Sequence, residues 1–296
     1  MIRFGTAGWS YDDWQGVVYP RSRPRGFDPL AYLARYFNTV EVNSTFYRPP
    51  RPEVPARWVK RVADNDDFKF TAKLWQRFTH QRDEAWTRDE AEAVRAGLDP
   101  LAERDRLGAV LVQFPWSFKA RDDSFEWLDD VTSEFSGYPL VVEVRHSSWN
   151  TPEFHRWLNE RGIGFVNIDQ PQFNRSIGPT AETSGRVGYV RLHGRNYEDW
   201  FREDAGREAR YDYLYSSDEL ELWVERIKEL GKDGSVEDVY VVTNNHYRGQ
   251  AAANAIMLSA MLRGGAQPAP APLVEAYSEA LRPFVVPEEG PQRRLL

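Results

Sequence analysis

Short runs of apolar and β-branched residues, bounded by glycine, proline or polar turn residues, recur along the chain. Each run has the length of a strand, and the residues that bound it are typical of turns. The pattern predicts eight strands, at Ile2–Thr6, Thr39–Asn43, Phe68–Leu74, Ala109–Phe114, Leu140–Arg145, Gly164–Asp169, Tyr189–His193 and Val239–Asn245.

Most segments between these runs carry apolar residues at helical spacing. The first of them follows Asp28, a residue type that caps helices. Helices are predicted at Pro29–Phe37, Glu53–Ala63, Thr87–Glu103, Ser124–Phe135, Thr151–Glu160, Ser217–Leu230, Gln250–Leu262 and Leu273–Leu281. The segment 170–188, after the sixth predicted strand, shows no helical pattern.

Strands that alternate with helices are typical of parallel βαβ units, and eight units in 296 residues predict an α/β fold, a single-domain TIM-like (β/α)8 barrel. An open doubly wound sheet is the alternative. To bind a nucleotide it needs a glycine-rich turn after an early strand, and the first turn, Gly5–Trp9, lacks that spacing. We expect the barrel in residues 1–265, and in 266–296 a C-terminal helix and tail that pack on it, with frayed last residues.

Polar residues are concentrated at the carboxyl ends of the predicted strands, where barrels of this type form their active sites. Successive side chains of a strand point to opposite faces, so residues two apart share a face. The pairs expected to point into the barrel are Glu41 with Asn43, Glu143 with Arg145, Asn167 with Asp169 and Arg191 with His193, with the apolar residues between them facing the helices. The acids, together with Lys73, Arg145 and Arg191, predict either a buried ion-pair network or a ligand-binding, catalytic site.

Aromatic and arginine residues follow the same strand ends. The rings, among them Trp9 and Tyr47, either cap the barrel or stack on sugars or bases. Arginines in the first two loops are expected to adjoin across the rim and can hold phosphate or carboxylate groups; they are Arg21, Arg23, Arg25, Arg48 and Arg51. The segment 196–216 is longer than an ordinary connection and is a candidate lid.

Composition narrows the function classes. The chain has no cysteine, which removes disulfides, thiolate metal sites and cysteine nucleophiles. A net charge of −7 repels nucleic acid at long range, so we expect a small-molecule partner rather than a polyanion. The N-terminus is unlike a signal peptide, and no apolar run is long enough to span a membrane, which together predict a cytoplasmic protein.

Seven sequence blocks, in order, resemble those of the YecE-like family, also called domain of unknown function 72: GTAGWSYDDWQGVVYP, FNTVEVNSTFYR, FKFTAKLWQRFTH, LGAVLVQFPWSF, VVEVRHSSW, YVRLHGR and YVVTNNHYRGQAAANA. The resemblance covers about residues 2–262 and implies a TIM-like barrel without assigning a reaction. The pocket residues that it implies are Glu41, Asn43, Tyr47, Lys73, Gln113, Glu143, Arg145, His146, Arg191, His193, Asn244 and Asn245.

The first functional hypothesis is an enzyme that acts by acid–base chemistry on a small anionic or sugar-like substrate: a hydrolase, a lyase or an isomerase. A carboxyl group whose pKa is raised by burial would act as general acid, and a second carboxylate as base or nucleophile. The candidate catalytic residues are Glu143, Asp169, His193 and Glu41. The candidate substrate-binding residues are Asn43, Tyr47, Lys73, Gln113, Arg145, His146, Arg191, Asn244, Asn245 and Trp9.

Two alternatives remain open. Glu41, Glu143, Asp169 and His193 are of the types that bind divalent metals, as in a metal-dependent hydrolase, isomerase or endonuclease-like barrel, although the neighbouring cations oppose a metal. Our expectation is therefore no metal and no cofactor. The other alternative is a non-catalytic module that binds a nucleotide or single-stranded nucleic acid through its rim arginines and aromatic rings.

Overall fold

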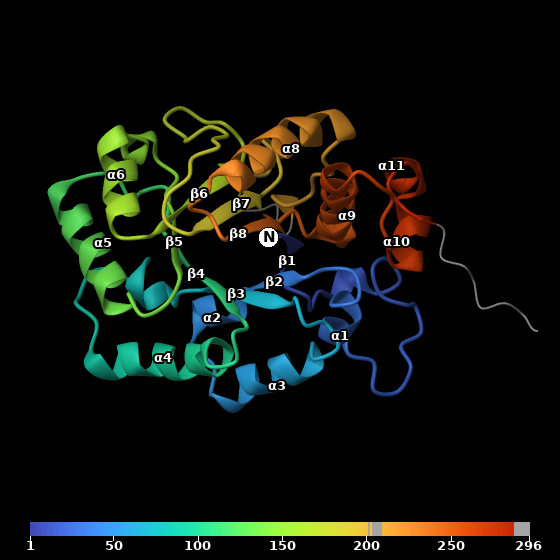
Figure 1. The fold of residues 1–296 in the computed structure, drawn as a ribbon, viewed down its shortest axis with the longest axis horizontal. Helices are drawn as coiled ribbons and strands as arrows, with labels where there is room; N and C mark the ends of the chain where they lie inside the picture. The colour runs from blue at the N-terminus through green and yellow to red at the C-terminus, as the bar shows by residue number, and fades with distance from the viewer. Residues whose placement is uncertain (201, 203–208, 287–296) are drawn as a thin grey trace, which may run out of the picture.

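The computed structural model describes residues 1–200, 202 and 209–286. Its centre is a closed barrel of eight parallel strands that follow one another in sequence order, with helices around the outside (Figure 1). The strands are β1 (Ile2–Ala7), β2 (Thr39–Val42), β3 (Lys69–Lys73), β4 (Leu107–Gln113), β5 (Leu140–Glu143), β6 (Gly164–Asp169), β7 (Val187–Leu192) and β8 (Asp238–Thr243). The predicted (β/α)8 barrel is thus confirmed.

Most of the outer helices lie close to their predicted positions, and a short helix at Ser44–Tyr47 was not predicted. They are α1 (Pro29–Leu33), α2 (Ser44–Tyr47), α3 (Glu53–Arg61), α4 (Arg88–Ala102), α5 (Asp122–Glu134), α6 (Pro152–Glu160), α8 (Ser217–Lys232), α9 (Gln250–Arg263), α10 (Ala271–Ala276) and α11 (Ser278–Leu281). Asp28 caps α1 as expected: its side chain accepts hydrogen bonds from the backbone N–H groups of Leu30 and Ala31. The predicted helix at 273–281 is interrupted at Tyr277, so α10 and α11 are separate.

The connection from β6 to β7, residues 170–186, contains no helix and is fully described. The absence of helical periodicity at 170–188 anticipated this. One outer face of the barrel is therefore covered by irregular backbone, whose polar groups need hydrogen-bond partners. Asn167 of β6 points outward and binds the backbone of this connection.

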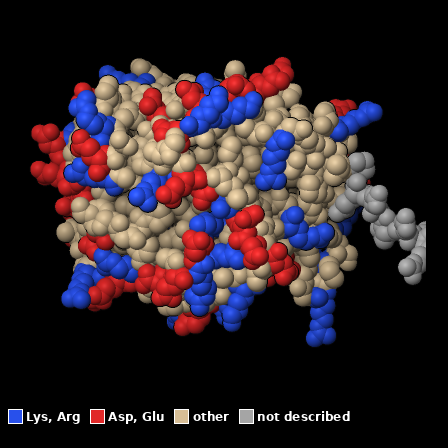
Figure 2. All heavy atoms as spheres, in the orientation of Figure 1, with Lys and Arg blue, Asp and Glu red and all other residues tan. Residues whose placement is uncertain are grey.

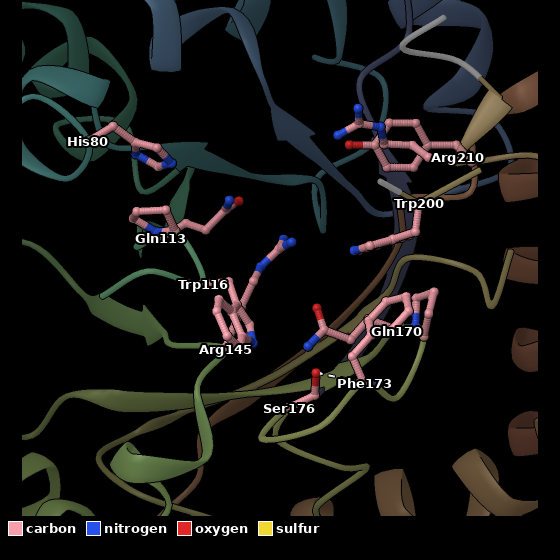
Figure 3. Close-up of a pocket in the computed structure, with 12 residues that line it drawn as sticks. His80, Gln113, Trp116, Arg145, Gln170, Phe173, Ser176, Trp200 and Arg210 are labelled. Atoms are coloured by element: carbon pink, nitrogen blue, oxygen red, sulfur yellow. Dashed lines mark hydrogen bonds between the residues drawn. The ribbon is translucent and has the colours of Figure 1, made fainter. Parts of the chain in front are cut away.

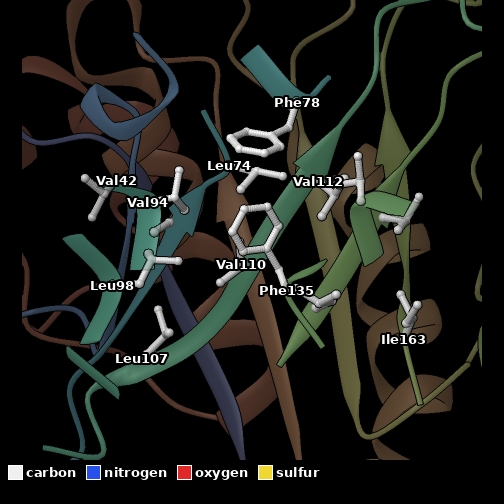
Figure 4. Close-up of a cluster of buried hydrophobic side chains, with 14 of the residues drawn as sticks. Val42, Leu74, Phe78, Val94, Leu98, Leu107, Val110, Val112, Phe135 and Ile163 are labelled. Atoms are coloured by element: carbon white, nitrogen blue, oxygen red, sulfur yellow. The ribbon is translucent and has the colours of Figure 1, made fainter. Parts of the chain in front are cut away.

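The larger part of the core lies between the strands and the helices. Val42, Val110 and Val112 on the outward face of the strands pack with Leu98 of α4 and Phe135 after α5 (Figure 4). Their outward direction agrees with the alternation read from the sequence, because the residues between them in the chain are those that enter the barrel.

A smaller apolar cluster fills the barrel itself. It includes Leu111, Ile168, Tyr189 and Tyr240. Gly108 makes room for the Tyr240 side chain, since a Cβ at that position would lie 2.2 Å from the Tyr240 hydroxyl. The filled interior closes the barrel below, and the polar site lies above it, at the carboxyl ends of the strands.

The segment after the barrel packs back on it. Leu273 of α10 and Leu281 of α11 are fully buried in the cluster that includes α9, and α10 and α11 lie beside α9 in Figure 1. The fraying expected for the last residues concerns 287–296, which lie outside the described residues.

The face drawn in Figure 2 shows acidic and basic residues interspersed around uncharged areas. A protein that tracks a nucleic-acid backbone presents a continuous basic stripe, and this face has none. Within the described ranges, no helix is both long and apolar enough to cross a membrane.

Candidate active site at the mouth of the barrel

Arg191, on β7, lies at the centre of the barrel's upper layer. Its Nε and Nη2 donate to the two carboxylate oxygens of Glu41, at 2.9 and 2.7 Å. Its Nη1 donates to Glu143 and, at 3.2 Å, to Gln113. Arg191 and both carboxylates are fully buried. One guanidinium therefore joins strands from opposite sides of the barrel, and the paired carboxylates raise the pKa of Arg191 although burial opposes this.

Glu143 is shared between two guanidinium groups. Besides Arg191, Arg145 donates to its Oε1 from Nε at 2.9 Å and from Nη2 at 2.8 Å. Burial alone would raise the pKa of Glu143, but Arg191 and Arg145 outweigh it and hold the pKa well below its ordinary value. The prediction that a buried carboxyl such as Glu143 serves as general acid is therefore wrong, because this one stays ionised.

His193 is held as a neutral ring. Asn244 Nδ2 lies 2.9 Å from its Nδ1, and the guanidinium groups of Arg191 and Arg145 lie 3.4 and 3.5 Å from its Nε2. The same Nε2 is 3.6 Å from Glu143 Oε1. Burial, with Arg191 beside it, lowers the pKa of His193 to about 3. His193 is thus a polar but uncharged wall of the site at any ordinary pH.

Lys73 ends β3 and differs from the other cations of this layer. The Thr45 hydroxyl donates to its backbone carbonyl at 2.7 Å, which fixes the end of the strand. Its Nζ lies 5.4 Å from the ring centre of Phe46 and has no hydrogen-bond or ion-pair partner among the residues described. Burial and the nearby Arg191 lower the pKa of Lys73 to about 8.

Two cavities open above this layer. The larger, about 630 Å³, is lined by Tyr11, Asn43, Phe46, Tyr47, Lys73, Gln76, Gln113, Arg210, Tyr211, Asn244 and His246. The smaller, about 230 Å³, is lined by His80, Gln113, Pro115, Trp116, Arg145, Gln170, Pro171, Phe173, Ser176, Trp200, Arg210 and Tyr211. Their linings share Gln113, Arg210 and Tyr211, so they adjoin. In Figure 3 the guanidinium of Arg145 extends into the space between Gln113 and Gln170.

The structure brings most of the predicted site residues together at this mouth. Glu41, Glu143, Arg191 and His193 form its buried floor. Asn43, Tyr47, Lys73, Gln113, Arg145 and Asn244 line the two cavities. Asn43 is notable because its buried Oδ1 has no hydrogen-bond partner.

Asp169 and Asn167 do not converge with the others, and the prediction that they point into the barrel is wrong. Ile168 between them belongs to the interior cluster. Asn167 binds the helix-free β6–β7 connection: its Oδ1 accepts from the backbone N–H of Glu182 at 2.8 Å. Asp169 accepts from Trp223 Nε1 on α8 at 2.5 Å. On the outer face of β6, Asn167 therefore satisfies irregular backbone, whereas Asp169 binds a side chain of α8.

Asp169 instead anchors the chain that follows β7. Its two oxygens accept from Nε and Nη2 of Arg195, at 2.8 and 2.6 Å. Arg195 also donates to Glu219 of α8 at 3.0 Å. This bidentate pair ties the start of the segment 196–216 to α8, and so helps to place Arg210 and Tyr211 at the mouth.

Three predicted binding residues lie away from the cavities. Trp9 packs edge-on against Trp58 of α3, with ring centres 5.6 Å apart. Asn245 points outward, and its Nδ2 donates to Asn254 Oδ1 on α9 at 2.8 Å. His146 lies beside Trp116 and lines neither cavity. These three residues were assigned to the pocket because they lie at or just after strand ends. The order of the strands does not determine the directions of their side chains.

Sequence reasoning missed several residues that do line the mouth. Arg210 lies in the long segment after β7, where no local pattern marks it. His80 lines the smaller cavity. The five rim arginines, from Arg21 to Arg51, line neither cavity. The lid expected at 196–216 falls partly on 201 and 203–208, which lie outside the described residues.

The acidic residues do not form a metal site. Within the described part of the chain, no group of three or more histidine, aspartate or glutamate residues is placed to hold an ion. Arg191 occupies the position between Glu41 and Glu143 that a cation would need, and Asp169 points elsewhere. The donor set therefore does not fit a divalent metal.

Comparisons with known proteins identify the family of the chain. The family model described as "Protein of unknown function DUF72" matches residues 3–276. The UPF0759 protein YunF of Bacillus subtilis is 31% identical over 267 residues, which cover 86% of this chain and 92% of that protein. The UPF0759 protein YecE of Escherichia coli K12 is 32% identical over 176 residues, 57% of this chain and 59% of that protein.

Solved structures give the same result. A DUF72 family protein from Thermotoga maritima is 36% identical with a TM-score of 0.77, and the match covers 89% of this chain and 99% of that one. A DUF72 family protein from Enterococcus faecalis is 26% identical with a TM-score of 0.76, and covers 89% and 96%. The resemblance seen in the sequence is confirmed, and the chain belongs to the DUF72 family, that of the UPF0759 proteins YunF and YecE.

Proposed function

We propose that this protein is an enzyme that binds a small substrate bearing a phosphate or carboxylate group at the mouth of the barrel and acts on it by acid–base chemistry. The observation that carries the proposal is an imbalance of charge. Glu41 and Glu143 are fully engaged by Arg191 and Arg145, while Lys73 and Arg210 line the larger cavity without a carboxylate among the residues that the structure describes.

The cations left over are placed to receive an anion. Arg145 uses Nε and Nη2 on Glu143 and keeps Nη1 without a partner in the described structure. The Nε of Arg210 is buried with no hydrogen-bond partner. Leaving the buried Nε of Arg210 unpaired is unfavourable, and an anionic ligand could accept charge-assisted hydrogen bonds from both guanidinium groups.

Lys73 takes the role of acid and base in this proposal. Because its pKa is lowered to about 8, both the amine and the ammonium forms are present near neutral pH, which suits proton transfer. Glu143 stays ionised and His193 stays neutral, so they hold the site without exchanging protons. The aromatic rings of Tyr11 and Tyr211, on either side of His246, would cover an apolar substrate face.

Calorimetry with inorganic phosphate, phosphorylated sugars and small carboxylates tests the proposal. We expect binding that Lys73→Met weakens at least about tenfold, since it removes a charge-assisted contact. Lys69→Met, at the opposite end of the same strand, is the matched control and should bind as the wild type does. Turnover of a bound phosphorylated or carboxylated compound, lost in Lys73→Met, would establish the enzyme. Absence of binding by every anion at low salt would overturn the proposal.

A further inference from the structure

We propose that Lys73 is a nucleophile that forms an imine with the carbonyl carbon of an aldehyde or ketone substrate. The proposal rests on the proposed function, because the same substrate would carry the phosphate or carboxylate group that the mouth binds. It narrows the substrate class to small anionic carbonyl compounds, and the reaction class to a lyase or an isomerase.

The surroundings of the amine suit a nucleophile in addition to the anion contact that its ammonium form makes. Lys73 Nζ faces the larger cavity beside the ring of Phe46, and no described carboxylate pairs with it. Arg191 and Arg145 oppose its protonation, while Glu41 and Glu143, which favour it, are already engaged. A lysine that only held an anion would gain from full protonation, whereas attack on a carbonyl requires the neutral amine.

Polar groups for the carbonyl oxygen flank the amine on both sides. Asn43 directly follows β2 and Gln113 ends β4, the two strands that pair with β3. Both side chains line the same cavity as Lys73. The amides can hydrogen-bond the hydroxyl of the first adduct, and the unpartnered Oδ1 of Asn43 can accept a hydrogen bond from it.

The smaller cavity can bind the anionic end of the substrate. The smaller cavity, which adjoins through Gln113, Arg210 and Tyr211, contains Arg145. Arg145 cannot approach a carbonyl as a nucleophile, since guanidinium stays protonated. The geometry therefore separates a cationic subsite for phosphate or carboxylate from an amine subsite for the carbonyl.

The step balances without an added oxidant or reductant. The neutral amine adds to the carbonyl carbon and forms the new C–N bond, giving a carbinolamine. The carbinolamine then loses its oxygen as water, which takes both hydrogens of the original amine, and an imine between Nζ and the substrate carbon remains. Protonated, this imine withdraws electrons from the adjacent carbon, which is the basis of proton abstraction or C–C cleavage there.

Reductive trapping tests the proposal with the intact protein. The probes are glyceraldehyde 3-phosphate and glyceraldehyde, each with cyanoborohydride at pH 7.5, followed by peptide mass spectrometry. The other lysines are Lys60, Lys69, Lys119, Lys228 and Lys232. A pKa of about 8 against an ordinary value of about 10.4 gives Lys73 on the order of 100-fold more neutral amine. We expect it to be labelled at least about tenfold faster than any other lysine.

The two probes and a competitor separate the two proposals. Faster trapping of the phosphorylated probe at Lys73, suppressed by inorganic phosphate and unchanged in Lys69→Met, supports both. Phosphate binding without a reduced adduct at Lys73 overturns the imine and leaves the anion site standing. Equal trapping of both probes, insensitive to phosphate, retains the nucleophile but overturns the anionic substrate. Uniform labelling of all lysines with no phosphate binding overturns both.

Discussion

Lys73→Met should make the protein more stable while removing its function. Among the residues described, the ammonium of Lys73 has no partner of its own and lies near Arg191 and Arg145. Methionine has a similar length without the charge. A pKa of about 8 in place of 10.5 corresponds to about 3 kcal/mol of unfavourable free energy for the protonated form. Water that reaches the half-buried side chain screens part of this, so we expect a gain of about 2 kcal/mol at pH 7.

The gain should depend on pH in one direction. The pKa of Lys73 is lower in the folded state, so between about pH 8 and 10.5 the unfolded chain binds more protons and the wild type becomes more stable as pH rises. Methionine does not titrate, so the advantage of Lys73→Met should be full below pH 8. By the same relation it should fall below about 1 kcal/mol at pH 10.

Urea unfolding of both proteins at pH 7 and pH 10 measures this, because the comparison cancels every other titrating group. Lys60→Met is the control: Lys60 is an exposed residue of α3, and its replacement should change the free energy of unfolding by less than about 0.5 kcal/mol at either pH. A wild type that is more stable than Lys73→Met by 1 kcal/mol or more at pH 7 would refute the reasoning. It would mean that the ammonium makes a structural ion pair.

Three further predictions concern the surrounding network. Glu143→Gln should lower the free energy of unfolding by about 3 kcal/mol, because it leaves two guanidinium groups without their carboxylate; a loss under 1 kcal/mol in urea unfolding would show that the pair is not structural. Asp169→Asn should cost about 2 kcal/mol through the weakened Arg195 pair, and a loss of phosphate binding in calorimetry by the folded variant would instead return Asp169 to the site. Burial lowers the pKa of His246 to about 4. Below about pH 6.5 the unfolded chain therefore binds more protons than the folded chain, and the protein loses stability as the pH is lowered. Thermal unfolding should show that His246→Gln loses less free energy of unfolding between pH 7.5 and pH 5 than the wild type does, by up to about 2 kcal/mol. An equal loss in the two proteins would contradict the lowered pKa of His246.

The fold could be predicted from the sequence because the strand signal is local. Each strand is a short apolar run between turn residues, and alternation on β2, β5 and β7 placed Glu41, Glu143 and Arg191 inside the barrel. The same rule failed on β6, because alternation shows which residues share a face of the strand but not which face points into the barrel. The missing helix at 170–188 was the signal that could have reversed that assignment for Asp169.

The chemistry of the site was harder to predict, because it depends on which charged side chains form ion pairs across the barrel. The sequence suggested a balanced set of acids and cations, and burial suggested a carboxyl with a raised pKa. In the structure the acids are engaged by Arg191 and Arg145, which lowers the pKa of Glu143 and leaves Lys73 as the group with a pKa near neutrality. Arg210 also lines both cavities. It lies in a long loop whose sequence pattern does not indicate where its side chains lie.

We propose that the mouth of the barrel is an anion site formed by Lys73, Arg210 and the Nη1 of Arg145. A crystal structure of the protein with phosphate, determined at pH 7, tests it most directly. The account predicts density for one phosphate in the adjoining cavities, in contact with Arg145, Lys73 or Arg210. Phosphate bound only at the exposed arginines of the first loop, with the mouth holding water alone, would contradict it.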